Sequence, residues 1–175
     1  MNSKRFKMIT SGRDFEKKVA LLSTQSVPSV ALRNMKFYFP LIHRGTECDV
    51  IVITQHSIYC VECKNYNSYI SGNEGDIVWF FRSSGKFGKV SNPVRANDKH
   101  IRVIRGLLRK NNADVLNIEN IVCVPDGTAI YTNSSSVMHL SRFVRKLMED
   151  SSKIPPVYNM NKVRELLESI SENRR

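Results

Sequence analysis

Three residues that can do chemistry lie close together in the sequence: Asp49, Glu62 and Lys64. The first two belong to apolar, β-branched segments, residues 48–54 and 57–64, that flank a two-residue turn. Two such segments around a short turn predict an antiparallel hairpin. Equal steps back from the turn along the two strands bring Asp49 opposite Glu62. The spacing therefore predicts two carboxylates that face each other across a β-ladder.

Like charges at opposed positions are destabilising, so a shared proton, a basic neighbour or a divalent cation must relieve them. Lys64 projects from the same strand face as Glu62. Carboxylate oxygens suit Mg²⁺ or Mn²⁺, and the backbone carbonyl of Cys63 can add a ligand. Such a cation activates a water and stabilises charge on a phosphate, and Lys64 can assist. The alternative is a solvated strand end at which Lys64 pairs with Glu47, its own opposite residue.

The elements that must position this hairpin are predicted from periodicity and capping residues. Helical spacing predicts helices over residues 12–22, 93–110, 138–150 and 161–173. Apolar runs predict further strands over residues 31–39, 69–71, 77–82 and 118–124. This succession of strands and helices predicts an α/β fold, with a mixed central β-sheet flanked by helices.

Length and composition predict a single domain. The chain has 175 residues, 41% of them hydrophobic and 25% charged, which excludes a disordered tail or a fibre. We expect a basic N-terminal arm over residues 1–11, the main domain over 12–150, and a helical extension packed on it over 151–175. The sequence shows neither a secretory h-region nor a membrane-spanning run, so we expect a cytoplasmic, intracellular protein with no membrane partner.

The four cysteines are expected to be reduced thiols. Cys60 and Cys63 form a CxxC pattern, but they lie within a strand and no second ligand pair accompanies them, so we interpret it as neither a redox pair nor a zinc site. The hairpin register predicts that Cys48 faces Cys63, with both thiols in the core.

The charge of the chain favours a polyanionic partner. Lys and Arg number 27 against 16 Asp and Glu, which gives a net charge of +11. Arg95, Lys99, Arg102 and Arg109 fall on one stripe of the predicted helix 93–110, where they can contact the phosphates of nucleic acid. The alternative for this basic stripe is a solvated helix face. Tyr66, close to the acidic pair, can stack on a base or simply pack against the protein.

Several motifs in order carry a family resemblance. They are Gly12-Arg13-Asp14-Phe15-Glu16, residues 47–53, residues 61–66, Ile70-Ser71-Gly72, Trp79, and Asn92-Pro93 with Lys99-His100. Over residues 12–125 the chain resembles the nuclease-related domain (NERD) family of the PD-(D/E)XK nuclease superfamily. Members of this superfamily cut DNA with Mg²⁺ or Mn²⁺. The resemblance implies a restriction-endonuclease-like (PD-(D/E)XK) core.

The resemblance also implies roles for individual residues. Asp49 and Glu62 resemble the metal-binding carboxylates, Lys64 resembles the catalytic lysine, and Glu16 resembles an additional acidic residue of the site. The alternative for Glu16 is a carboxylate at a helix start that complements the macrodipole. The chain departs from the family at Ala96, where a Gln is common.

We therefore expect a metal-dependent nuclease that hydrolyses phosphodiester bonds in DNA. The alternatives are a noncatalytic nucleic-acid-binding module with the same fold, and a scaffold that docks an acidic protein. Because NERD segments often occur joined to helicase domains, the resemblance also implies a helicase-type partner in trans, with a homodimer as the alternative.

Overall fold

The computed structural model describes residues 3–39, 44–113, 117–153, 155–157 and 159–171, and of residues 3–11, 39 and 44 the backbone alone. The helices are α1 (Ser3–Ser26), α2 (Pro93–Lys110), α3 (Leu140–Lys153) and α4 (Met160–Ile170). The strands are β1 (Val30–Phe39), β2 (Arg44–Ile53), β3 (Ile58–Cys63), β4 (Tyr69–Ser71), β5 (Val78–Ser83), β6 (Lys86–Ser91), β7 (Ile118–Val124), β8 (Ala129–Tyr131) and β9 (Val137–His139).

Five strands form the central sheet, here called sheet A, in the order β1-β2-β3-β7-β9. The first three strands pair antiparallel, whereas β7 is parallel to both β3 and β9. Strands β3 and β7 are nearly continuous apolar runs, as expected for strands that are buried on both faces. The predicted α/β fold with a mixed central sheet is confirmed.

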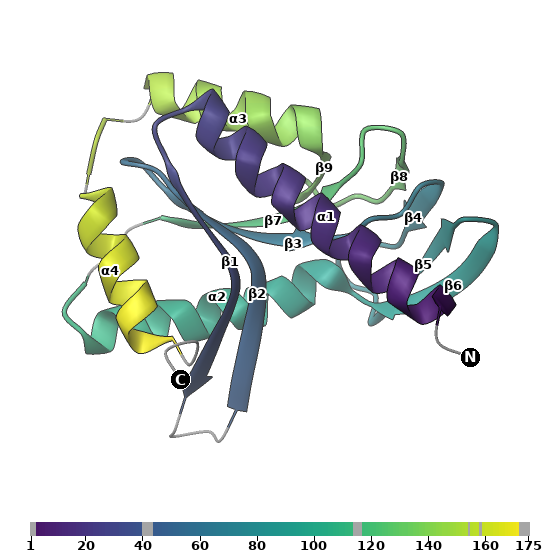
Figure 1. Cartoon of the computed structure of the whole chain (residues 1–175), viewed down its shortest axis with the longest axis horizontal. Coiled ribbons are helices and arrows are strands. Elements are labelled where there is room, and N and C mark those ends of the chain that lie inside the picture. Colours follow the sequence, from purple (N-terminus) through teal and green to yellow (C-terminus); the bar gives the residue numbers. More distant parts are fainter. Residues whose placement is uncertain (1–2, 40–43, 114–116, 154, 158, 172–175) are drawn as a thin grey trace.

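Helices cover both faces of sheet A (Figure 1). Helices α1 and α3 pack on one face, where Phe15 and Phe143 join a buried cluster with Val61. Helices α2 and α4 pack on the other face, where Ile104 and Leu167 join a second cluster. The strand residues of the site therefore lie between two hydrophobic layers.

A second sheet, sheet B, contains four strands in the order β6-β5-β4-β8 (Figure 1). Its inner face packs against sheet A and the start of α2 through a cluster that includes Ile70, Trp79 and Val94. Strands β6, β8 and β9 were not predicted, and the start of the predicted helix 138–150 is in fact β9. Short strands and the glycine- and lysine-containing β6 give little periodic signal.

The start of α2 is fixed by Asn92, which is buried and caps the helix. Its side-chain oxygen accepts hydrogen bonds from the backbone N–H groups of Val94 and Arg95 at 3.0 and 3.1 Å. Its amide donates to the backbone carbonyl of Asp76 at 2.8 Å. Pro93 occupies the first helical position, where its missing N–H costs nothing. The predicted start of this helix is confirmed.

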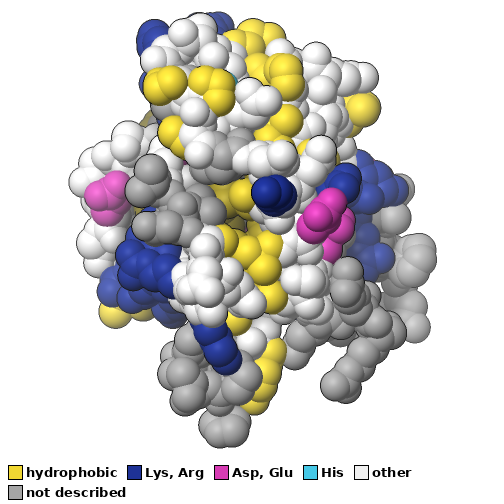
Figure 2. Space-filling model, turned by 90° about the vertical axis from the view of Figure 1, so that its left-hand side faces the viewer, with side chains coloured by type: hydrophobic (Ala, Val, Ile, Leu, Met, Phe, Trp, Pro, Cys, Tyr) yellow, Lys and Arg dark blue, Asp and Glu magenta, His cyan; other side chains and the backbone are white. Residues whose placement is uncertain are grey.

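Figure 2 shows the end of the molecule that lies on the left in Figure 1. Hydrophobic side chains run down the middle of this face, and Lys and Arg side chains lie on either side. Lys17, Lys36 and Arg145 are exposed and lie outside α2, so the positive charge of the chain is not confined to that helix. No helix in the described part of the chain is both long and apolar enough to cross a membrane.

Candidate active site

The hairpin of β2 and β3 has the predicted register. Four residue pairs form the ladder, from Ile53 opposite Ile58 to Val50 opposite Val61. The side chain of Thr54 closes the turn, since its hydroxyl oxygen accepts the backbone N–H of Ser57 at 3.0 Å. Asp49 and Glu62 are the next residues on the two strands beyond the last pair.

Sheet A bends at Asp49. Strand β1 pairs with β2 on both sides of this point, but the pair of Asn34 with Asp49 is missing from the ladder, and Asn34 has a φ of 52°. Alternation is broken there, because Cys48 packs in the same cluster as Ile51 rather than with Val50. A distortion of this kind re-aims side chains along a strand.

The bend makes the prediction that Cys48 faces Cys63 wrong. The Cys48 thiol instead lies 3.8 Å from the sulfur of Cys60, and Cys63 pairs with Cys123 in the β3–β7 ladder. All four cysteines are free thiols. Burial raises the pKa of Cys63 and Cys123, so these thiols stay protonated and unreactive.

Asp49 is a half-buried acid in direct contact with the neighbouring strand. One carboxylate oxygen accepts the backbone N–H of Cys63 at 2.8 Å. Burial and, to a smaller extent, the charge of Glu62 raise the pKa of Asp49, whereas the Cys63 N–H and Lys64 lower it, and the net result is a pKa of about 7. Glu62 is therefore close enough to Asp49 to affect the protonation of Asp49.

Glu62 is only 9% exposed and is held by two cationic or polar side chains. Lys64 Nζ lies 2.6 Å from one carboxylate oxygen, and His100 Nε2 of α2 lies 3.7 Å from the other. Burial lowers the pKa of Lys64, but the ion pair with Glu62 outweighs it and the net shift is upward. Glu47 pairs with Lys36 at 3.9 Å, so the alternative in which Lys64 pairs with Glu47 is wrong.

His100 contacts the acidic pair, and the sequence did not predict this contact. Its Nδ1 is hydrogen-bonded to the hydroxyl of Thr46 on β2, and its pKa is lowered mainly by burial, against the opposing effect of Glu62. At 3.7 Å its Nε2 is a polar neighbour of Glu62 but too far away for a hydrogen bond. The sequence gave no sign that Thr46 would reach α2.

Glu16 lies well inside α1, which begins at Ser3. The macrodipole alternative for Glu16 is therefore wrong, because that effect is confined to the first turn. Burial raises its pKa, a hydrogen bond from Asn34 lowers it, and its own charge contributes to the raised pKa of Asp49. Its Oε2 atom is buried and has no hydrogen-bond partner. Helix α1 thus brings a third carboxylate toward the bend, with one oxygen available to a ligand.

The donor chemistry fits a hard divalent cation, whereas the spacing of the acids does not form a closed site. Among the described residues, no three His, Cys, Asp or Glu side chains lie close enough together to hold a metal ion. Mg²⁺, however, is commonly bound by one or two carboxylates together with waters and substrate phosphates. The pair Asp49 and Glu62 meets that smaller requirement.

The basic stripe of α2 is exposed as its spacing predicts. Arg95, Lys99, Arg102 and Arg109 all lie on the solvent side, while residues such as Ile104 are buried on the opposite side. The stripe borders the candidate site, because Lys99 directly precedes His100. Contact with phosphates remains a prediction.

Comparison with protein families identifies the chain. The model of the nuclease-related domain matches residues 11–125, about two thirds of the sequence. The chain belongs to the nuclease-related domain (NERD) family. It is also 37% identical over 68 residues to an uncharacterized protein of Bacillus anthracis, a match that covers 37% of this chain and 31% of that protein. No solved structure matches the chain.

The NERD match includes Ala96, where a Gln is common in the family. Asn97, the next residue, has a clear structural role. Asn97 is buried on the apolar face of α2, and its amide donates to the backbone carbonyl of Cys60 at 2.8 Å and to Asn120 Oδ1 at 2.7 Å. It thus ties α2 to β3 two residues before Glu62. Asn97 shares the apolar face of α2 with Ile101 and Ile104. A polar residue at this helical spacing was the sequence signal that could have revealed its structural role.

Tyr66 of the NERD domain packs against the protein. Its ring stacks on Phe81 of sheet B, with ring centroids 4.1 Å apart and planes 5° apart. The hydroxyl of Thr128 hydrogen-bonds to its backbone carbonyl. One face of the ring is thus occupied, and stacking of a base on Tyr66 remains a prediction.

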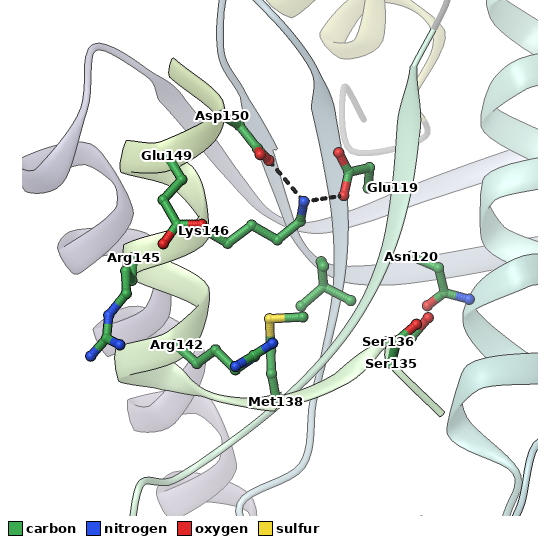
Figure 3. A pocket seen from close by; sticks show the side chains of 11 residues that line it. Glu119, Asn120, Ser135, Ser136, Met138, Arg142, Arg145, Lys146, Glu149 and Asp150 are labelled. Carbon is green, nitrogen blue, oxygen red and sulfur yellow. Dashed lines mark hydrogen bonds and ion pairs between the residues drawn. The ribbon is translucent and has the colours of Figure 1, made fainter. Parts of the chain in front are cut away.

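A separate cavity of about 500 Å³ lies between β7, the segment before β9, and α3 (Figure 3). Lys146 extends into it and lies 2.8 Å from both Glu119 and Asp150, and Tyr59 donates its hydroxyl to Asp150 at 2.7 Å. The cavity contains none of the predicted site residues. Lys146, Glu119 and Asp150 pair with one another, so we interpret this network as support for the fold.

Proposed function

We propose that this NERD chain is a metal-dependent nuclease that hydrolyses phosphodiester bonds in DNA. The observation that carries the proposal is the proximity of half-buried Asp49 to buried Glu62, with Lys64 paired to Glu62 at 2.6 Å. Two acids on neighbouring strands and a lysine directly after one of them, in a strongly basic protein, suit chemistry on a phosphate. The PD-(D/E)XK core that the resemblance implies is part of the same proposal.

Each residue has a task in the proposed reaction. Asp49 and Glu62 would hold Mg²⁺ or Mn²⁺, and the backbone carbonyl of Cys63 would add a ligand. The cation, when bound, would lower the pKa of a water and offset negative charge on the phosphate. Lys64 would leave its pairing with Glu62 in part to stabilise the charge that develops. Glu16, through its unpartnered oxygen, would orient a water or the cation.

The basic stripe supplies the proposed binding of the sugar-phosphate backbone. Arg95, Lys99, Arg102 and Arg109 project from α2 into solvent, and phosphate contacts of this type position nucleic acid without reading its sequence. Since Lys99 is adjacent to His100, which contacts Glu62, a strand held along α2 would pass the acidic pair. We therefore propose binding with little sequence preference and with strong salt dependence.

A noncatalytic nucleic-acid-binding module is the second candidate function. Two observations favour it: the tight pair of Lys64 with Glu62 occupies one of the oxygens that a metal would need, and no three potential ligands gather in the described part of the chain. In this case the basic stripe would bind DNA, and the acids would only hold strand ends together.

The test is cleavage of plasmid and of single-stranded circular DNA with Mn²⁺, Mg²⁺ or EDTA. We expect nicking with either metal, none in EDTA, and a loss of about a hundredfold or more in Asp49→Asn and Lys64→Ala. Lys36→Ala and Asp14→Asn, which alter exposed residues, are the matched controls and should cleave normally. Calorimetric titration with MnCl₂ should show weaker binding in Asp49→Asn.

Two outcomes would overturn the nuclease proposal. One is a folded wild-type chain that cleaves nothing in Mn²⁺, and the other is an Asp49→Asn variant that cleaves like wild type, which would point to a contaminant. DNA binding in EDTA without cleavage in Mn²⁺ would instead establish the noncatalytic module.

A further inference from the structure

The outer face of sheet B is an unusual exposed surface. Alternation along β5 turns Trp79 inward and Phe80 outward, and the cross-strand register extends this division to the other strands. We call the outward set the aromatic face, and its main residues are Tyr69, Phe80, Arg82, Phe87, Lys89 and Tyr131. Sheet A is covered on both faces, whereas the aromatic face of sheet B is open to solvent.

The aromatic rings of this face are accessible. Phe87 is 61% exposed, Tyr131 is 63% exposed and Phe80 is 39% exposed. They occur as two ring pairs: Phe80 stacks near Phe87 with centroids 5.7 Å apart, and Tyr69 meets Tyr131 edge-on at 6.2 Å. Clustered large apolar side chains on a protein surface commonly mark an interaction site.

The cations of the aromatic face alternate with its rings. Arg82 is the cross-strand partner of Phe87, and Lys89 is the partner of Phe80, with its ammonium 5.7 Å from the ring centroid. The four strands contain Arg82, Lys86 and Lys89 and no Asp or Glu. The surface therefore offers stacking planes and positive charge at regular intervals.

The nearest acids along the chain lie in the loop before β5 and are already engaged. The side chain of Asp76 accepts the backbone N–H of Asn73 at 2.7 Å. Glu74 accepts the hydroxyl of Ser134 at 2.8 Å. Asp76 is thus held within its own loop, and Glu74 is held to the segment between β8 and β9. Among the described residues, neither carboxylate forms an ion pair with Arg82 or Lys89.

We propose that the aromatic face binds single-stranded nucleic acid next to the candidate active site, an inference that rests on the proposed function. Unpaired bases can stack on exposed rings while Arg82 and Lys89 contact the phosphates between them. A duplex hides its bases from such rings. A protein partner fits less well, since the core of a protein interface is depleted of charged residues such as those that alternate with the rings here.

Hydrogen bonds connect the aromatic face to the loop that follows the candidate active site. Asn67, three residues after Lys64, accepts the backbone N–H of Ser84 at 2.6 Å and donates to the hydroxyl of Ser84 at 3.2 Å. The loop that follows Lys64 is thus fastened to the β5–β6 turn. Tyr69 follows Lys64 by five residues, so the two are at most about 18 Å apart. A strand bound on the aromatic face can therefore extend to Glu62 within a few nucleotides.

The test is the affinity of the full chain for fluorescein-labelled oligo-dT of about 15 nucleotides, measured by anisotropy in EDTA so that nothing is cleaved. We expect the double variant Phe87→Ala/Tyr131→Ala to bind at least about tenfold more weakly, and a blunt duplex to compete poorly. Because both side chains are exposed, the variant should fold, as thermal unfolding can verify. Tyr38→Ala, which removes an exposed ring from β1 in sheet A, is the matched control.

The outcomes separate this inference from the nuclease proposal. An aromatic-dependent affinity for oligo-dT in a chain that never cleaves would support the aromatic face and contradict the nuclease. Cleavage of DNA by the double variant at the wild-type rate, with unchanged oligo-dT affinity, would overturn the aromatic face alone. The inference would also fail if the two substitutions converted a dimer into a monomer without altering the affinity for oligo-dT, since the occupant would then be a second copy of the chain.

Discussion

The charged residues of the two sheets in this NERD domain differ in their exposure to solvent. Sheet A is packed between two helical layers, and the acids at its bend, Asp49 and Glu62, are largely removed from water. Sheet B is packed on one side only, and its cations, such as Arg82 and Lys89, extend into solvent. Burial amplifies interactions between charges, whereas solvent screens them.

We therefore propose different functions for the two regions. The proposed reaction needs charged groups in an environment where each ion or proton has a large effect, and the bend in sheet A has that environment. A binding surface needs accessible groups that are already solvated at little cost, and the aromatic face of sheet B provides them. The four predictions below test the contrast, from the largest expected effect to the smallest.

The first prediction compares two Phe→Ala substitutions, one in each sheet. Phe37→Ala should lower the free energy of unfolding by about 3–5 kcal/mol, because the ring is fully buried beneath α2 and α4. Phe87→Ala should change it by no more than about 0.5 kcal/mol, because its ring is exposed. Urea unfolding of both variants measures the difference. Similar losses in the two variants would contradict the one-sided packing of sheet B.

The second prediction concerns the inner face of sheet B. A Cβ at Gly88 would lie 2.5 Å from the ring of Phe81, which cannot retreat because Tyr66 stacks on it at 4.1 Å. Gly88→Ala should therefore lower the free energy of unfolding by about 1–3 kcal/mol. Gly75→Ala is the control, since nothing lies within 4 Å of its added Cβ. Equal melting temperatures for the two variants would show that the Phe81 ring is free to move.

The third prediction uses the raised pKa of Asp49, which is about 7 in the folded chain against 3.8 for the free side chain. Between those values the folded state binds more protons than the unfolded state, so wild-type stability falls as pH rises through this window. Asp49→Asn cannot ionise and keeps an oxygen for the Cys63 N–H. It should be more stable than wild type by about 1 kcal/mol or more at about pH 8, with the difference fading near pH 4.

Thermal unfolding in EDTA across this pH range measures the effect of Asp49→Asn. Asp14→Asn, on the exposed side of α1, should show no comparable pH-dependent gain. The same Asp49→Asn variant should be inactive in the cleavage assay, because the acid that destabilises the fold is the one to which the proposed reaction assigns the role of metal ligand. If Asp49→Asn is less stable than wild type at high pH, ionisation of Asp49 does not destabilise the folded state.

The fourth and smallest prediction compares two lysines. Lys89→Ala should lower the free energy of unfolding by about 0.5 kcal/mol, the value of an exposed cation–π contact with Phe80. Lys146→Ala should cost more, about 1–3 kcal/mol, because Glu119 and Asp150 lose their shared cation beneath sheet A. Chemical denaturation distinguishes them. A larger loss for Lys89 would mean that sheet B is less solvated than its exposure indicates.

Local signals predicted much of the fold. The helix start at Asn92-Pro93 was found because capping and proline rules are local, and β7 was predicted with its observed bounds, Ile118–Val124, because a buried strand is a continuous apolar run. The division into two sheets was not predicted. Strand pairing depends on contacts between distant segments, and nothing in residues 69–71 alone shows that they pair with residues 129–131.

The candidate site was predictable as far as the hairpin register extends. Counting from the turn gave the four observed pairs from Ile53–Ile58 to Val50–Val61, but the directly opposed Asp49–Glu62 pair that it also predicted is not part of the ladder. Counting failed for Cys48, because a regular alternation was assumed and the left-handed backbone at Asn34 breaks it. His100 and Thr46 meet only in three dimensions, so their contact with each other had no sequence signal.

The parallel pairing of β3 with β7 has a consequence for how the chain is made. Strands β1 to β3 are sequential neighbours and can associate early, but the free edge of β3 has to wait for residues 118–124, which are synthesised about sixty residues later. Until then a ribbon of apolar residues ending in Glu62 remains open to other strands. Nascent or interrupted chains should therefore be the aggregation-prone species, and binding by a chaperone should be concentrated in that interval of translation.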